Sequence, residues 1–345
     1  MAQPRCASAQ LFLVQGSTNE VKIMDRKQFL ATVMALGGSA FLPEVKASVV
    51  ERMGALLAEA PTKKIDSRKV VFLSDIHICG EFKDGKPKVY PYNPTSLQLC
   101  INDILAMRPL PANVVVTGDV AWDYGLEEDY RYAAELLSPL EKAGITVTLG
   151  MGNHDRRKAF LKVFPRYAAQ TKVEGRIVTH IALPDVDVMM LDSLCELPDL
   201  QPRQATTVSG EINAAQIEWL KAFTAQSDRP IILCAHHPIG EMPNLDKFVS
   251  DTPSVAGFVY GHTHSWNKIA RIMRQRQPLR MVPMVNLPAT FYGDIGFAVM
   301  TTTPQGAKFE YSSKGFWWPQ PMENSPAEWQ RRADDLQGEV AHFVF

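Results

Sequence analysis

The stretch Val70-Val71-Phe72-Leu73-Ser74-Asp75-Ile76-His77 decides the fold, because four apolar residues lead directly to an aspartate and a histidine two positions apart. Val70 to Leu73 have the β-branched or bulky apolar side chains that are typical of a strand buried on both faces. Asp75 and His77 follow where this strand is expected to end. Alone, this pair is weak evidence for a site, since aspartate is common in turns and most single histidines are surface or core residues.

The same pattern occurs four more times along the chain. Five unrelated loops that share no site are therefore an improbable explanation of these polar residues. In an open α/β sheet, sites form beyond the carboxyl ends of the strands, so five such ends can converge on one crevice. Six of the eight histidines lie in these positions. The four further apolar runs and the polar residues that follow them are 113–117 with Gly118-Asp119, 145–149 with Gly152-Asn153-His154-Asp155, 231–235 with His236-His237, and 255–260 with Gly261-His262-Thr263-His264.

Helical spacing of apolar residues between the first three strands predicts a βαβαβ unit and therefore a parallel sheet. Two adjacent runs joined by Pro184-Asp185 predict an antiparallel pair instead. The chain is therefore expected to combine helices with mixed sheets. The expected helices are 95–107, 126–142, 213–225 and one that begins at Ser325-Pro326, and the further strands are 178–183, 186–191, 281–286, 295–300 and 308–311.

Length and composition predict a globular α/β protein with a substantial core. The chain has 345 residues, of which 46% are hydrophobic, and its formal net charge is -1. This balance gives no electrostatic reason to bind long nucleic acids or an anionic membrane. The basic run from Lys268 to Arg280 is interpreted as a solvated loop, with contact to an anionic substrate as the alternative. The five cysteines show no spacing typical of disulfides or zinc knuckles.

Residues 1–50 are expected to be an N-terminal extension. Arg26-Lys27 precede a short apolar stretch from Phe29 to Leu42, and Val45-Lys46-Ala47 offers small residues for a signal peptidase. Residues 25–30 resemble a twin-arginine export signal with lysine as the second basic residue. An export signal here implies that the protein is periplasmic or extracytoplasmic. The alternative is that this stretch is an ordinary surface helix and that the protein is cytoplasmic. No stretch is long and apolar enough to predict stable membrane insertion.

Taken together, the five motifs resemble those of the calcineurin-like metallophosphoesterase family, in the order that this family has them. The resemblance covers residues 66–313 and leaves 314–345 as a C-terminal tail with a short helix. It implies an α/β fold, a four-layer αββα sandwich of two mixed β-sheets with flanking helices, and a two-metal site at the strand ends. The stretches around Asp129-Tyr130, around Arg157 and Phe160, and around Gln216 to Leu220 look most like class III cyclic nucleotide phosphodiesterases.

The resemblance also implies a set of metal ligands. Asp75, His77 and His264 would hold one metal, Asn153, His236 and His262 would hold the other, and the carboxylate of Asp119 would bridge them. Mixed carboxylate, imidazole and amide ligands suit two divalent or mixed-valence ions of Mn, Fe, Zn or Co, rather than Ca or a thiolate-bound metal. His237 is expected not to be a ligand, with a contact to substrate as the alternative.

The family places His154 where it can protonate the leaving oxygen, a role that suits an imidazole with a pKa near neutral. A carboxylate should orient this imidazole, and the sequence leaves two candidates, Asp155 and Asp123. Trp122 occupies the position of the tyrosinate ligand of purple acid phosphatases, so a ferric-tyrosinate centre is not implied.

Charge counting favours a small phosphoester as the substrate. Two divalent metals bring four positive charges, and Asp75, Asp119 and a bridging hydroxide return three, which leaves about +1 for an anion. The family reaction is hydrolysis by attack of that hydroxide, and the residual charge favours phosphodiesters. The alternatives are a phosphomonoesterase of the same fold and a metal-bound module that binds a partner without turnover. The loop from Gly80 to Pro94 is expected to form a wall that limits substrate size.

Overall fold

The computed structural model describes two separate units of the chain. Internal contacts divide the chain into residues 1–62 and 63–345, and each unit is described by itself. In the first unit, β1 (Phe12–Gln15) and β2 (Val21–Met24) form an antiparallel pair. The expected export segment at 25–50 lies outside the described residues. The described residues are 12–15, 21–24, 64–88, 93–198, 201, 203–204, 206–273, 280–317 and 326–345.

Two six-stranded sheets form the centre of the second unit. The first sheet has the order β16-β15-β14-β3-β6-β7 and comprises β3 (Ile65–Leu73), β6 (Leu110–Val116), β7 (Thr146–Leu149), β14 (Gly293–Thr303), β15 (Gly306–Trp317) and β16 (Val340–Val344). The second has the order β12-β13-β11-β10-β9-β8 and comprises β8 (Thr179–Ala182), β9 (Asp187–Met190), β10 (Ile231–Cys234), β11 (Val255–Tyr260), β12 (Asn267–Met273) and β13 (Arg280–Asn286).

Both sheets are mixed, as the sequence predicts. Strands β3, β6 and β7 are parallel, and β14 runs antiparallel to β3. In the second sheet β9, β10, β11 and β13 are parallel, whereas β8 and β12 are antiparallel edge strands. The expected antiparallel pair around Pro184-Asp185 is therefore confirmed.

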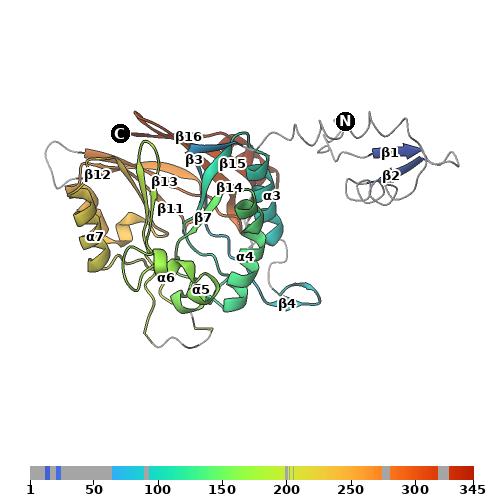
Figure 1. The fold of residues 1–345 in the computed structure, drawn as a ribbon, viewed down its shortest axis with the longest axis horizontal. Helices are drawn as coiled ribbons and strands as arrows, with labels where there is room; N and C mark the ends of the chain where they lie inside the picture. Colours follow the sequence, from blue (N-terminus) through green and yellow to red (C-terminus); the bar gives the residue numbers. More distant parts are fainter. Residues whose placement is uncertain are drawn as a thin grey trace, which may run out of the picture. The chain divides into compact units, whose positions relative to one another are not determined.

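Helices cover the outer faces of the two sheets. Figure 1 shows α3 (Asn93–Ala106) and α4 (Glu127–Lys142) on one side and α7 (Ala214–Thr224) on the other. The remaining elements are the helices α5 (Arg157–Val163), α6 (Arg166–Gln170), α8 (Pro243–Asp251) and α9 (Pro326–Leu336), the short 3-10 turn η1 (Ile239–Glu241), and the two-residue strands β4 (Phe82–Lys83) and β5 (Lys86–Pro87).

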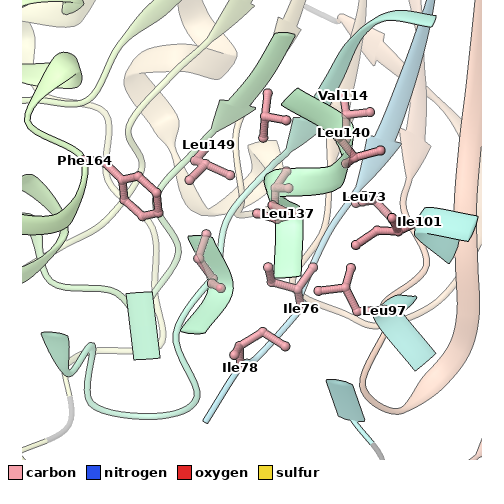
Figure 2. Packing of buried hydrophobic residues seen from close by; sticks show 14 of the residues in the cluster. Leu73, Ile76, Ile78, Leu97, Ile101, Val114, Leu137, Leu140, Leu149 and Phe164 are labelled. Carbon is pink, nitrogen blue, oxygen red and sulfur yellow. The ribbon is translucent and has the colours of Figure 1, made fainter. Parts of the chain in front are cut away.

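Side chains along β3 point alternately to the second sheet and to the helices, and in this way they join the layers. Val70 and Phe72 pack into a cluster with residues of the second sheet such as Ile232. Val71 and Leu73 point to the opposite face, because successive side chains of a strand alternate. There they pack against α3 and α4 through residues such as those labelled in Figure 2. A third cluster joins α7 and α8 to the outer face of the second sheet. The four-layer αββα sandwich is thus confirmed.

Two edge strands were not anticipated by the sequence analysis. Lys268 and Arg271 lie within β12, so the interpretation of the basic run from Lys268 to Arg280 as a loop is wrong for its first part. Arg271 pairs with Asp246 on α8. In the C-terminal segment, α9 is followed by β16, which pairs with β15 and completes the edge of the first sheet. No helix among the described residues is long and apolar enough to cross a membrane.

Leu97 and Leu99 on α3 provide a matched test of the core. Leu97 is fully buried, whereas Leu99 is 52% exposed. We expect Leu97→Ala to lower the free energy of unfolding by about 2–5 kcal/mol, because it removes buried methyl groups and leaves a cavity. Leu99→Ala should lower it by roughly 0.5 kcal/mol or less. Urea denaturation measures both values, and equal losses would contradict the packing of α3.

Candidate metal centre

The loops after β3, β6, β7, β10 and β11 meet at one edge of the two sheets. Within the first sheet, the backbone N–H of Asp75 donates to the carbonyl of Gly118 at 3.1 Å. Between the sheets, the backbone N–H of His262 donates to Oδ2 of Asp75 at 3.0 Å. The carboxyl ends of parallel strands therefore bring together residues that are far apart in the sequence.

Asp75, His77 and His264 form the first group of side chains whose ligand atoms all lie within 4.8 Å of one another. Nε2 of His264 lies 3.1 Å from Oδ1 of Asp75 and 3.3 Å from Nε2 of His77. All three residues are buried. The group matches the first ligand set implied by the sequence.

Asp119 lies between this group and a second one. Its Oδ2 is 3.7 Å from Nε2 of His77 and 3.1 Å from Nε2 of His236. Nε2 of His236 in turn lies 3.3 Å from Nδ1 of His262. A carboxylate that faces both sets has the position expected of a bridging ligand.

Backbone carbonyls fix which nitrogen of His77 and His264 carries a hydrogen. Nδ1 of His77 lies 3.0 Å from the carbonyl oxygen of Trp122, and Nδ1 of His264 lies 3.2 Å from that of Tyr292. Because a carbonyl only accepts, Nδ1 is the donor, and Nε2 of the neutral ring carries a lone pair. Two lone pairs then face each other at 3.3 Å. A cation between them would remove the repulsion.

Unpartnered buried atoms support the same interpretation. Oδ1 of Asp75 and Oδ1 of Asn153 are buried and have no hydrogen-bond donor among the described residues. Buried oxygens of this kind are costly unless a partner satisfies them. Carboxylate, amide and imidazole atoms are the donor types that divalent transition metals accept. The side chains of this site therefore fit two such ions.

The backbone of the site is held in an unusual conformation. Seven described residues other than glycine have a positive φ, and five of them belong to the predicted ligand set. Left-handed backbone costs about 1–3 kcal/mol at such residues and persists where the surrounding structure enforces it. The five are Asp75 at 50°, His77 at 42°, Asp119 at 49°, His262 at 70° and His264 at 53°.

Burial and neighbouring charges shift the pKa values of the buried carboxylates and imidazoles, and most of the shifts favour the deprotonated form that binds a metal. Burial raises the pKa of Asp75 and Asp119, but the neighbouring histidines outweigh it and hold both pKa values below the usual range. Burial lowers the pKa of His77 to about 4 and also lowers the pKa of His262. For His236, Asp119 and Asp75 outweigh burial and raise its pKa to about 9. A metal bound at His236 would therefore displace a proton.

His154 is oriented by Asp123. Its Nδ1 lies 3.1 Å from Oδ1 of Asp123, and both side chains are about one-third exposed. Burial lowers the pKa of His154, but the hydrogen bond to Asp123 and the charge of Asp119 outweigh it and raise the pKa to about 9. Asp123 thus holds the imidazole of His154 at the open side of the site.

Asp155 has a different environment, which corrects the expectation that it belongs with the catalytic residues. Its carboxylate accepts hydrogen bonds from the backbone N–H groups of Val120, Ala121 and Gly152 and from the hydroxyl of Tyr130. The residue is fully buried. Asp155 therefore holds the loops after β6 and β7 together and does not orient His154.

The two arginines that follow Asp155 point to other partners. Arg157 pairs with both oxygens of Asp192 at 2.7 Å and with Glu196 at 3.1 Å. Arg156 is buried and donates to the carbonyls of Asp155 and Gln204. Neither guanidinium is directed at the metal ligands.

Ser193 is a residue of the site that the sequence analysis missed. Its hydroxyl oxygen accepts from the backbone N–H groups of His236 and His237, and it lies 2.8 Å from Nδ1 of His237. His237 is buried beside His236 and His262, at ring distances of 4.9 and 4.8 Å. Ser193 follows the apolar strand β9, so the rule that identified the other motifs would also have found it.

Comparisons with known proteins agree with this geometry. Residues 68–266 match the family model for calcineurin-like phosphoesterases. A protein from Rhodopseudomonas palustris, named probable cyclic nucleotide phosphodiesterase, is 31% identical over 173 residues, which are 49% of this chain and 57% of that protein. The chain thus matches little more than half the length of this relative.

Similar solved structures include a purple acid phosphatase from yellow lupin seeds, with 15% identity and a TM-score of 0.49 over 80% of this chain and 53% of that one. Vacuolar protein sorting 29 from Cryptosporidium parvum has 12% identity and a TM-score of 0.34 over 80% of this chain and 97% of that one. The match to the family model covers more than half of the chain and includes every motif from Asp75 to His264. The chain therefore belongs to the calcineurin-like phosphoesterase family.

Proposed function

We propose that this protein is a dinuclear metal-dependent hydrolase that cleaves phosphodiesters in preference to phosphomonoesters. Its family membership supports phosphoester chemistry, and the name of the Rhodopseudomonas relative supports the diester preference. The observation that carries the preference is the engagement of Arg156 and Arg157 with other partners.

Seven side chains would hold the metals in this proposal. Asp75, His77 and His264 would hold one ion, Asn153, His236 and His262 would hold the other, and Asp119 would serve both. When bound, the two Mn, Fe, Zn or Co ions supply an activated water and neutralise charge on the phosphoryl oxygens. The buried walls of the site keep bulk water away from the ligands, which strengthens these electrostatic interactions.

His154 would complete the reaction by giving a proton to the leaving oxygen. Asp123 accepts from Nδ1 of His154, so the proton available to substrate is the one on Nε2. Asp123 also stabilises the charged imidazole before transfer and keeps the ring in one orientation. The partial exposure of both residues gives a substrate access to this proton.

The arginine contacts determine which phosphate charge the site can accept. A phosphomonoester dianion carries one more negative charge than a diester, and arginine is the side chain best suited to bind it. The charge of Arg157 is already balanced by Asp192 and Glu196. The net charge of about +1 that remains near the metals matches the single charge of a diester.

Asp119→Asn should lower metal content and activity together, because it removes the charge that both ions share. We expect metal affinity to fall by at least the roughly 10- to 100-fold that loss of an outer-sphere partner costs. Elemental analysis after dialysis, with turnover of the same sample, measures both effects. Asp246→Asn on α8 is the control and should change neither. Two tightly bound ions with near-normal turnover in Asp119→Asn would show the dinuclear assignment to be wrong.

His154→Ala should retain its metals but lose roughly 10²- to 10⁴-fold in turnover of esters with poor leaving groups, which need protonation. The loss should be much smaller for nitrophenyl esters. Asp123→Asn should show the same dependence on the leaving group at smaller amplitude, because it removes the charge that stabilises the protonated imidazole and loosens its orientation but leaves the imidazole in place. If both classes of ester lose activity equally, His154 is not the proton donor.

Bis(4-nitrophenyl) phosphate should be cleaved with a higher kcat/KM than 4-nitrophenyl phosphate. In Arg157→Gln the ratio between the two substrates should stay within about twofold, because this guanidinium is engaged by Asp192 and Glu196. Steady-state kinetics of the metal-loaded enzyme measures both. A tenfold preference for the monoester, about 1.4 kcal/mol in the transition state, would assign the protein as a phosphatase instead.

A further inference from the structure

Arg332 on α9 lies far outside the segment that matches the family model, yet it contacts a buried residue next to the metal centre. Its Nε and Nη2 each donate to the carboxylate of Asp294 at 2.7 Å. Asp294 is only 1% exposed, whereas Arg332 is 45% exposed. The guanidinium also lies over the ring of Phe316, 5.4 Å from its centre, which restricts its orientation.

Asp294 holds the chain on both sides of Ser265. Its backbone N–H donates to the carbonyl of His264 at 2.9 Å. Its Oδ2 accepts from the backbone N–H of Trp266 at 2.8 Å. Gly293, with φ +86°, permits this close approach, because a Cβ there would lie 2.0 Å from the carbonyl oxygen of His264. The backbone around His264 is therefore fixed by Asp294.

The same segment also orients the His264 ring. The carbonyl of Tyr292 accepts from Nδ1 of His264 at 3.2 Å, and Nε2 then lies 3.1 Å from Oδ1 of Asp75. Residues 292 to 294 thus set both the backbone and the ring of one predicted metal ligand. The carboxylate of Asp294 is the charged group among residues 292 to 294, and burying such a group is costly unless a cation pairs with it.

We propose that Arg332 is a positioning residue for the metal centre. By pairing with the buried carboxylate of Asp294, it keeps His264 directed at the ion shared with Asp75 and His77. The C-terminal helix α9 then contributes to the position of a metal ligand. The proposal rests on the ligand set of the proposed function, and its test measures metal binding separately from turnover.

The test is Arg332→Gln, with Mn²⁺ affinity measured by calorimetry and the Mn²⁺ spectrum measured by electron paramagnetic resonance. We expect affinity for one of the two ions to fall by up to roughly 10-fold, the low end of the loss seen when a direct partner of a ligand is removed, because Arg332 acts on His264 only through Asp294. The spectrum should change from that of a coupled pair to that of a single ion at intermediate Mn²⁺. Arg332→Lys keeps the charge and should recover part of the affinity.

Arg68→Gln is the matched control. Arg68 also pairs with both oxygens of a nearly buried carboxylate, Asp185, at 2.7 and 3.1 Å, and the exposed fractions of the two side chains are 46% and 5%. This pair lies at the start of β3, whereas Asp75 follows the end of that strand. We expect Arg68→Gln to bind both ions as the wild type does, even if it lowers stability by a similar amount.

Three outcomes would overturn the proposal. Arg332→Gln could bind both ions with wild-type affinity, or Arg68→Gln could weaken binding equally, which would indicate general destabilisation. A wild type that binds fewer than two ions would contradict the metal centre itself. If Arg332→Gln fails to fold, Arg332→Met takes its place and is judged by the same affinity and spectrum, because it keeps an apolar side chain near Phe316 and removes both hydrogen bonds to Asp294. A wild type that binds two ions but cleaves no phosphoester would contradict only the proposed function.

Discussion

The structure of the site depends on the burial of two carboxylates, Asp75 and Asp119, among imidazoles that offer lone pairs more often than protons. Both carboxylates are almost fully buried, and Oδ1 of Asp75 has no hydrogen-bond donor. Removing an ionised carboxylate from water is costly unless a cation compensates it. Nε2 of His77 and Nε2 of His264 cannot donate in their neutral forms. In the proposed metal centre, divalent ions between these atoms would compensate both the buried charge and the facing lone pairs.

The fold supports this arrangement by placing it at one edge of the two packed sheets. The site residues follow directly after buried strands, and five of them have left-handed backbone that would relax in a flexible loop. Carbonyls of residues 122 and 292 fix the imidazoles of His77 and His264, and the Asp155 carboxylate ties together the loops after β6 and β7. Clusters of buried apolar residues on both faces of the sheets support these loops. The predicted ligands are therefore held in place by contacts with the protein's own backbone and side chains.

The resemblance to the family implied the layered fold, which is confirmed. Local pattern predicted that the five motifs meet at one crevice, because each motif follows its own apolar strand. It could not choose between Asp123 and Asp155, since that choice depends on which loop folds over His154. The carbonyls of Trp122 and Tyr292 carry no residue signature, because any residue has a carbonyl. Arg332 lies 38 residues from Asp294, and nothing in its helix indicates that contact. Local pattern thus identifies side chains that follow strands, whereas it gives no sign of the groups that hold those side chains in place.

Asp123, Asp155, Arg156 and Arg157 show that the contacts of a charged side chain decide whether it is available to a substrate. Asp155 is saturated by backbone donors and cannot serve substrate, whereas Asp123 keeps an oxygen on His154 at the open side. Arg156 and Arg157 likewise donate their hydrogen bonds to carbonyls and carboxylates of the protein. In the proposed function, positive charge for the substrate would come from the metal ions rather than from guanidinium groups. The ligands would neutralise most of that charge, and for this reason the proposal expects a singly charged anion such as a phosphodiester.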